Sequence, residues 1–316
     1  MQARPGIRAC RESGMSGVGH SVAGVSISTE HRPSVEPAAA TGDSRPRRRP
    51  ALSPSRAADY KQCPLLYRFR AIDRLPAPPS KAQLRGTLVH SALENLYGLP
   101  AADRVTARAL ALVDDAWAEM LSTNEFASGL VADEDRAGFL AEAQALVASY
   151  YTLEDPTRFD PESCEQLVET ELDDGVLLRG YIDRIDVAPT GQVRVVDYKT
   201  GRAPREIAEA KSLFQMKFYA VVLRRTRGIV PAQLRLLFLK DGQILTYSPD
   251  EDELRRFERT LSAIWTAIRA AGETGDFRPK PGKLCGWCDF QALCPSFGGT
   301  PPEYPGWPSE PVEVTA

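Results

Sequence analysis

The chain has 316 residues, 43% of them hydrophobic and 26% charged, so it can bury a sizeable core and is not disordered throughout. Its 39 basic and 42 acidic side chains give a net charge of −3, which excludes an overall basic surface of the kind that coats nucleic acid. The sequence contains neither an apolar run of about 18 residues nor a secretory signal peptide, which predicts a cytoplasmic protein without a membrane partner.

The two ends of the chain are predicted to be disordered. Residues 1–50 lack apolar periodicity and carry eight arginines against four acids, which leaves a net charge of −7 for residues 51–316. Residues 300–316 contain five prolines. Segments of this composition bury too little apolar surface to offset the entropy that is lost on ordering.

The region between the ends shows the periodicities of several helices, a three-strand meander, a helix, two strands and a last helix. Ser53-Pro54 is typical of a helix start, because serine caps a helix and proline fits its first turn. Asp241-Gly242 favours a hairpin between the last two strands. This order predicts an α/β core preceded by a helical subdomain. The predicted helices cover 53–70, 81–97, 104–122, 134–153, 206–226 and 250–274, and the predicted strands cover 166–173, 176–188, 192–199, 232–240 and 243–248.

The most informative stretch is a predicted hairpin over residues 180–201. Gly191, at the third position of a three-residue loop, suits the left-handed residue of a bulged turn, which pairs Ala188 with Gln192. With this register Asp183 lies directly opposite Asp197, with Cβ atoms about 4.5–5.5 Å apart.

Strand alternation predicts that these two acids point inward. They share a face with Lys199 and with four apolar residues, Ile185, Val187, Val193 and Val195. Opposed carboxylates on a buried face need a compensating cation, and a divalent metal is a stronger candidate than Lys199 because hard cations prefer oxygen ligands. The alternative is a buried Asp–Lys pair with the second acid held by backbone donors. Asp186 falls on the other face, where an ordinary cross-strand ion pair with Arg194 explains it.

Three short motifs resemble the RecB-type branch of the PD-(D/E)XK nucleases. The first is Asp183 followed by Asp197-Tyr198-Lys199, with Gly180 leading in. The second, Gly86-Thr87-Leu88-Val89-His90, is similar to that branch's helical histidine motif. The third, Gln215-Met216-Lys217-Phe218-Tyr219, resembles its Gln-x-x-x-Tyr helix. The resemblance covers about residues 52–297.

The resemblance implies a restriction-endonuclease-like fold with a mixed central sheet flanked by helices. It implies a helical subdomain at 51–160 carrying Cys63 and His90, a nuclease core at 161–275, and a C-terminal cysteine cluster at 276–299. His90, Asp183, Asp197 and the carbonyl of Tyr198 would ligate Mg²⁺ or Mn²⁺, and Lys199 would position the attacking water.

Several residues near these motifs have both a functional and a structural interpretation. Gln215 and Tyr219 share a helix face, so both are expected at the nucleic acid or the metal, with Tyr219 as a core residue the alternative. Glu94, one turn from His90, either supports it or is solvated. Glu171 matches an accessory acid on the preceding strand.

The cysteines form a second group of candidate ligands. Cys285, Cys288 and Cys294 form C-x2-C-x5-C, and the candidate for a fourth soft ligand is Cys63, 222 residues upstream. This pattern resembles the iron-sulfur staple of AddB and of RecB-like CRISPR-associated exonucleases, which implies that the four cysteines hold a [4Fe-4S] cluster. Zinc at the same four thiolates remains the alternative. Cys10 and Cys164 are expected to be free thiols, with Cys164 ahead of a strand.

The leading functional hypothesis is a Mg²⁺- or Mn²⁺-dependent DNA exonuclease in repair or recombination, acting on single strands or free ends. No Gly-x-x-x-x-Gly-Lys-[Ser/Thr] phosphate loop occurs, so any unwinding requires a helicase partner. The alternatives are a non-catalytic nucleic-acid-binding scaffold subunit of a helicase–nuclease complex and a redox iron-sulfur protein. Nucleic acid contacts are expected from two arginine clusters, which the alternative treats as solvated helix faces: Arg68, Arg70, Arg74 and Arg85, and Arg224, Arg225 and Arg227.

Overall fold

The structure is a computed structural model that describes residues 49–77, 79–123, 125–203 and 206–307. The predicted disordered leader, with Cys10, falls almost entirely outside the described residues, as does the tail beyond Trp307. Among the described helices, none combines the length and the apolar character that a membrane crossing would need.

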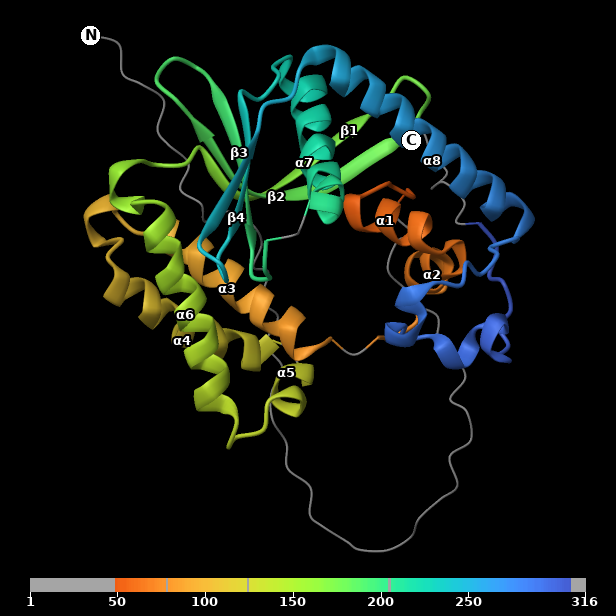
Figure 1. The fold of residues 1–316 in the computed structure, drawn as a ribbon, viewed down its shortest axis with the longest axis horizontal. Helices are drawn as coiled ribbons and strands as arrows, with labels where there is room; N and C mark the ends of the chain where they lie inside the picture. Colours follow the sequence, from red (N-terminus) through yellow and green to blue (C-terminus); the bar gives the residue numbers. More distant parts are fainter. Residues whose placement is uncertain (1–48, 78, 124, 204–205, 308–316) are drawn as a thin grey trace, which may run out of the picture.

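A five-stranded mixed sheet forms the centre of the fold, as expected, with its strands in chain order (Figure 1). The first three strands form an antiparallel meander, the third and fourth are parallel, and the last two are antiparallel. The parallel pair is joined by a helix that crosses over the sheet. The strands are β1 (Ser163–Glu171), β2 (Leu177–Val187), β3 (Val193–Lys199), β4 (Gln233–Phe238) and β5 (Gln243–Tyr247).

Helices cover both faces of this sheet, and each face has its own hydrophobic cluster (Figure 1). One cluster joins Ile185 and Val195 to α1, α2, α7 and α8. The other joins Val196 and Tyr198 to α3, α4 and α6. The region predicted as one helical subdomain therefore contributes to both clusters. The helices are α1 (Pro54–Gln62), α2 (Pro64–Tyr67), α3 (Lys81–Tyr97), α4 (Thr106–Thr123), α5 (Glu125–Leu130), α6 (Arg136–Leu153), α7 (Glu206–Arg227) and α8 (Glu251–Thr274).

The first predicted helix starts as expected but is not continuous. The side chain of Ser53 accepts a hydrogen bond from the backbone N–H of Arg56, which caps α1. The prediction of a single helix to Arg70 is wrong, because Cys63 adopts an extended conformation with φ −160° and ψ 116°. The ring of Pro64 disfavours helical geometry at the residue before it, and so a new helix begins after the break.

The β2–β3 hairpin has the predicted register. Gly191 has a left-handed φ of 85°, and the N–H of Ala188 donates to the carbonyl of Gln192 over 2.9 Å. Arg184 pairs with Val196 and Asp186 with Arg194, which continues the register assumed for the two acids.

Two segments differ from expectation. The helix α5 was not predicted. Residues 300–307 have no helix or strand, but they are packed: the Tyr304 hydroxyl donates to the carbonyl of Gly272, and the indole of Trp307 lies against the same glycine. A side chain at position 272 would collide with that indole, which explains a glycine inside α8.

Candidate active site and cysteine cavity

Three potential metal ligands converge from one helix and two neighbouring strands. His90 comes from α3, Glu165 from β1 and Asp183 from β2, and one ligand atom of each lies within 4.8 Å of the other two. The Nδ1 atom of His90 is 3.5 Å from an Asp183 oxygen and 3.6 Å from a Glu165 oxygen. Among the described residues, this is the one group of three such side chains that is close enough to share a metal ion.

The backbone of Tyr198 completes this group. Its N–H donates to Asp183 Oδ2 over 2.7 Å, and its carbonyl oxygen lies 3.0 Å from Nε2 of His90. A histidine binds one cation through one ring nitrogen. Ligation by Nδ1 together with the two acids would leave Nε2 to hydrogen-bond the Tyr198 carbonyl, and ligation by Nε2 would place that carbonyl among the ligands. The residues present therefore fit a hard divalent ion.

Sequence reasoning missed Glu165 and chose Glu171 as the accessory acid, which is wrong. Glu171 lies at the far end of β1, where its carboxylate forms an ion pair with Arg49 at 2.6 Å. Glu165 lies opposite Asp183, between the paired residues Cys164–Arg184 and Gln166–Ile182. Because β1 begins at Ser163, three residues before the predicted start, Cys164 is inside the strand and Glu165 can reach Asp183.

The backbone at Glu165 has an unusual conformation. Its φ of 44° lies in the left-handed region, which costs energy for a residue with a side chain. The alternation of β2 also shifts at Asp183, opposite Glu165. Leu178 and Ile182 precede Asp183 and Ile185 follows it, yet all three join the same hydrophobic cluster, although Ile182 and Ile185 are an odd number of residues apart. The kink lets both neighbours of Ile185, Arg184 and Asp186, be buried on the other face.

A second set of polar contacts surrounds Asp197, which is only 1% exposed. The ammonium nitrogen of Lys199 is 2.6 Å from Asp197 Oδ2 and donates to the amide oxygen of Gln215 over 2.8 Å. The Gln215 amide nitrogen lies 2.8 Å from Asp197 Oδ1 and 3.1 Å from the Tyr219 hydroxyl. These contacts join four of the five predicted catalytic side chains, and the fifth, Asp183, lies in the His90–Glu165 group. Tyr219 is also a core residue.

These contacts contain both parts of the alternative interpretation, an Asp–Lys pair and an acid held by a backbone donor. What that interpretation leaves unexplained is the convergence of His90 and Glu165 on Asp183. Asp197 does not join that metal-ligand group in the structure, and its carboxylate instead contacts Lys199 and Gln215.

The acids of this cluster repel one another when they are charged. Burial raises the pKa of Asp183 to about 7, and the nearby charge of Asp197 adds to this increase. Burial lowers the pKa of His90, but the hydrogen bond to Glu165 and the charges of the two aspartates outweigh burial and raise it to about 9. Without a metal, the acids are therefore compensated by protons on Asp183 and His90. Burial and the charge of Glu165 also raise the pKa of Glu94.

Lys199 and Gln215 also line an open groove of about 1060 Å³ between α1, β2 and α7. The described lining residues include the cations Arg56, Lys61 and Arg179 and no acid. Tyr181, two residues before Asp183, lines it with a ring that is 56% exposed. Gly180 lies where a side chain would come within 2.9 Å of the Tyr219 ring.

The two arginine clusters expected to bind nucleic acid are instead bound to acids. Arg68 pairs with Asp73 and is buried, and Arg70 and Arg85 also form ion pairs. The cluster at the end of α7 is bound in the same way, with pairs Arg224–Glu251, Arg225–Asp173 and Arg227–Glu162. Arg179 in the groove lining is also paired with an acid, Glu169. Arg56 and Lys61 line the groove without an acid partner among the described residues, which makes the groove the better candidate surface.

The four predicted cluster ligands line one cavity of about 270 Å³ at the end of the molecule. Cys63 occupies the break between α1 and α2, and the other three lie in short 3₁₀ turns of residues 283–297. The remaining lining is mostly apolar, and burial raises the pKa of Cys288, with the charge of Cys63 adding. Four thiols around one cavity meet the ligand number of both zinc and a cubane cluster. The four are Cys63, Cys285, Cys288 and Cys294.

Comparison with known proteins gives the following matches. The PD-(D/E)XK nuclease superfamily matches residues 51–295. The Gene 69 protein of Mycobacterium phage D29 is 27% identical over 289 residues, 78% of this chain and 97% of the phage protein. The Gene 69 protein of Mycobacterium phage L5 is 30% identical over 127 residues, 39% of this chain and only 41% of that relative. The crystal structure of a "Putative exonuclease" from Eubacterium rectale has the same fold, with a TM-score of 0.50 and 12% identity, over 75% of this chain and 86% of that chain.

Proposed function

Because this chain belongs to the PD-(D/E)XK nuclease superfamily, we propose that it is a RecB-type exonuclease that hydrolyses DNA with the help of Mg²⁺ or Mn²⁺. The convergence of His90, Glu165 and Asp183 beside Lys199 carries this proposal. The exonuclease named among the structural matches supports it at the level of the fold alone.

The proposed metal ligands are His90, Glu165, Asp183 and the carbonyl of Tyr198, with Asp197 joining when the cation binds. The bound cation would activate water and stabilise negative charge on the phosphate oxygens. Lys199 would donate a hydrogen bond to the attacking water, whose oxygen bonds to phosphorus as the bond to the leaving strand breaks. The attacking water would lose one proton to solvent, and the leaving oxygen would take a proton from a second water. Gln215 holds Lys199 and Asp197 at a fixed separation, because it contacts both.

We propose that a single DNA strand lies in the groove that ends at Lys199. Its cations, Arg56, Lys61 and Arg179, match the charge of the phosphate backbone, and no described acid in the lining opposes it. The exposed ring of Tyr181 gives a base a surface on which to stack, an interaction that tolerates any base sequence.

The enzyme proposal is tested by incubating labelled single-stranded DNA with the protein and Mg²⁺ or Mn²⁺. Wild type is expected to cleave and EDTA to abolish cleavage. Lys199→Met is expected to reduce cleavage at least about 100-fold while leaving Mn²⁺ binding intact, because a preorganised charge is lost from the reacting centre. Lys240→Met, at the exposed turn after β4, is the matched control and should cleave like wild type. No metal-dependent cleavage by wild type, or equal cleavage by Lys199→Met, would refute the proposal.

The requirement for a free end is tested separately with linear and circular single strands of one sequence. An exonuclease degrades the linear strand and spares the circle, whereas equal degradation of both indicates an endonuclease. A helicase partner in repair or recombination is part of the proposal, so blunt duplex DNA should resist degradation until a helicase and ATP are added.

We further propose that the four-cysteine cavity holds a [4Fe-4S] cluster. The four thiols line one cavity and meet the ligand number of a cubane cluster, in which each thiolate binds a different iron. Zinc at the same four thiolates is the alternative, and metal analysis distinguishes the two.

The cluster proposal is tested on protein purified without oxygen. We expect about four irons per chain and a broad visible absorption, and Cys63→Ser should lose both. Cys164→Ser is the matched control, because Cys164 lies in β1 and does not line the cavity. One zinc and no iron per chain would establish the alternative metal instead.

A further inference from the structure

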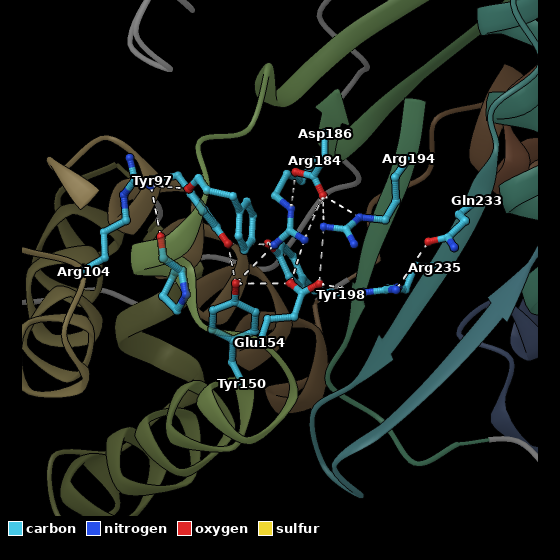
Figure 2. A network of polar contacts seen from close by, with 12 residues as sticks. Tyr97, Arg104, Tyr150, Glu154, Arg184, Asp186, Arg194, Tyr198, Gln233 and Arg235 are labelled. Carbon is cyan, nitrogen blue, oxygen red and sulfur yellow. Dashed lines mark hydrogen bonds and ion pairs between the residues drawn. The ribbon is translucent and has the colours of Figure 1, made fainter. Parts of the chain in front are cut away.

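The residue after Asp183 is an arginine whose side chain has no exposed surface. Arg184 reaches Tyr97 of α3 and Tyr150 of α6, on the side of the sheet that these helices cover (Figure 2). Its guanidinium forms ion pairs with Glu154 over 2.7 Å and with Asp186 over 3.0 Å. These ion pairs neutralise the buried charge of Arg184, but they do not explain why an arginine stands next to a proposed metal ligand.

Three tyrosine hydroxyls surround one nitrogen of this guanidinium. Nη1 of Arg184 lies 2.7 Å from the hydroxyl of Tyr198, 2.9 Å from that of Tyr97 and 3.2 Å from that of Tyr150 (Figure 2). Burial raises the pKa of each of these phenols above its ordinary value, so all three stay neutral and accept hydrogen bonds from the cation.

Two of these tyrosines belong to the two elements that the metal site joins. Tyr97 is on α3, two turns after His90. Tyr198 is on β3, and its own N–H and carbonyl contact Asp183 and His90. Arg184 therefore links α3 to β3 through the rings of Tyr97 and Tyr198. The His90 ring belongs to the same contact, with its centroid 6.0 Å from that of the Tyr198 ring and its Nε2 3.0 Å from the Tyr198 carbonyl.

A rigid link between α3 and β3 would fix the positions of the metal ligands that these two elements carry. Buried ion pairs add little net stability compared with apolar packing, so the network of Arg184 is poorly explained by stability alone. Metal sites tolerate only about 0.5 Å of displacement of their ligands, and partners that orient those ligands change metal affinity by about 10–100-fold. The planar, five-donor guanidinium can hold two hydroxyls and two carboxylates at once, which a lysine ammonium cannot.

We propose that Arg184 is a positioning residue that fixes α3 against β3 through Tyr97 and Tyr198, and thereby sets the spacing of His90 and the Tyr198 carbonyl for a divalent cation. This inference rests on the proposed metal-dependent function of the same site. It assigns Arg184 no contact with the metal or with the substrate.

The matched pair for the test is Arg184→Lys and Arg235→Lys. Arg235 belongs to the same network, since it pairs with Glu154 over 3.2 Å, but no tyrosine of α3 or β3 is among its recorded hydrogen-bond partners (Figure 2). Both variants keep the charge, so both should lower the Tm. Arg184→Lys is expected to weaken Mn²⁺ binding about 10–100-fold by calorimetry, whereas Arg235→Lys should bind Mn²⁺ within about twofold of wild type.

A milder variant keeps the inference testable if Arg184→Lys fails to fold. Tyr97→Phe removes one hydroxyl and leaves the ring, and it should still weaken Mn²⁺ binding severalfold. Because α3 is the element displaced, the loss should appear as a higher Mn²⁺ concentration for half-maximal cleavage, with the cleavage rate at saturating Mn²⁺ nearly restored. A structural role alone would lower the Tm without this shift.

The outcomes separate the two claims. If wild type neither binds Mn²⁺ nor cleaves DNA, the proposed function fails and the inference with it. If wild type binds Mn²⁺ and the Arg184 and Tyr97 variants bind it equally well, only the positioning role is overturned. Equal losses of affinity in Arg184→Lys and Arg235→Lys would also overturn it, because general destabilisation would then explain both.

Discussion

The β2–β3 hairpin carries two buried polar clusters that differ in their balance of charge. In one cluster, Asp183 meets Glu165 and His90 while the neighbouring Asp197 pairs with Lys199, and the carboxylates outnumber the cations. In the other cluster, Arg184, Arg194 and Arg235 surround Glu154 and Asp186, so that every described acid of the network has an arginine partner. The clusters are built from adjacent residues of the same strands.

The difference indicates what each cluster is for. A network whose charges are matched internally has no need of a ligand and can hold the chain in one arrangement. A cluster with an excess of acid, next to an open cationic groove, remains electrostatically incomplete until a cation enters. Neighbouring positions of β2 thus have different roles: Asp183 is a proposed metal ligand, and Arg184 and Asp186 hold the surrounding elements in place. Substitutions at these positions can therefore be compared in pairs.

The largest expected effect comes from comparing Asp183→Asn with Asp186→Asn. Asp183→Asn removes a proposed metal ligand and should reduce cleavage more than about 100-fold, since even partners of ligands cost 10–100-fold. It should nevertheless raise the stability of the metal-free protein by about 1 kcal/mol, or 2–4 °C in Tm, because the charged form of Asp183 is disfavoured by burial.

Asp186→Asn should do the reverse. It weakens the charged hydrogen bonds to Arg184 and Arg194, so we expect a loss of about 2–3 kcal/mol with much of the cleavage activity retained. Thermal unfolding with EDTA, paired with a cleavage assay, measures both quantities. Destabilisation by Asp183→Asn as large as that by Asp186→Asn would remove the distinction between the clusters.

The acid-rich cluster should also be the one that responds to pH. Cation binding requires that His90, with a pKa of about 9, and Asp183, with a pKa of about 7, both lose their protons. Affinity for Mn²⁺ should therefore rise with pH, by about tenfold per unit below pH 9 from His90 alone and more steeply below pH 7. Calorimetry at pH 6, 7 and 8 would reveal the slope, and an affinity that does not change over this range would contradict the assignment.

A smaller effect is expected at the mouth of the groove next to this cluster. Tyr181→Ala should weaken binding of single-stranded DNA by about 5–100-fold, which corresponds to the loss of one stacked base. Val187→Ala is the matched control, because Val187 is also an exposed apolar residue of β2 but does not line the groove. Fluorescence anisotropy with a labelled strand and no metal isolates binding from cleavage. Equal affinities of the two variants would exclude stacking on Tyr181.

Local sequence was sufficient to predict the hairpin and part of the site. Gly191 determines the turn, the turn determines the register, and the register brings Asp183 towards Asp197 and Lys199. The helix break at Cys63 had a usable signal, because the residue before a proline avoids helical geometry.

Long-range packing was not predictable in the same way. Glu165 joins the site through its pairing opposite Asp183 and through a left-handed backbone that no residue pattern indicates. The simple alternation of β2 predicted an ordinary cross-strand ion pair for Asp186, and the pair with Arg194 exists. That face is nevertheless buried, because helices from the N-terminal half of the chain cover it. The residues around Asp186 do not indicate which helices will pack on them.

The cysteine cavity has a consequence for how the protein is made. Cys63 faces residues 285–294, which leave the ribosome 222 residues later. At about 5–20 residues per second, Cys63 waits on the order of 10–45 seconds for the segment that carries the other three cysteines. The apolar residues Leu65 and Phe69 beside it lack these last packing partners during synthesis, so chaperone contacts should persist there until the C-terminal turns are made.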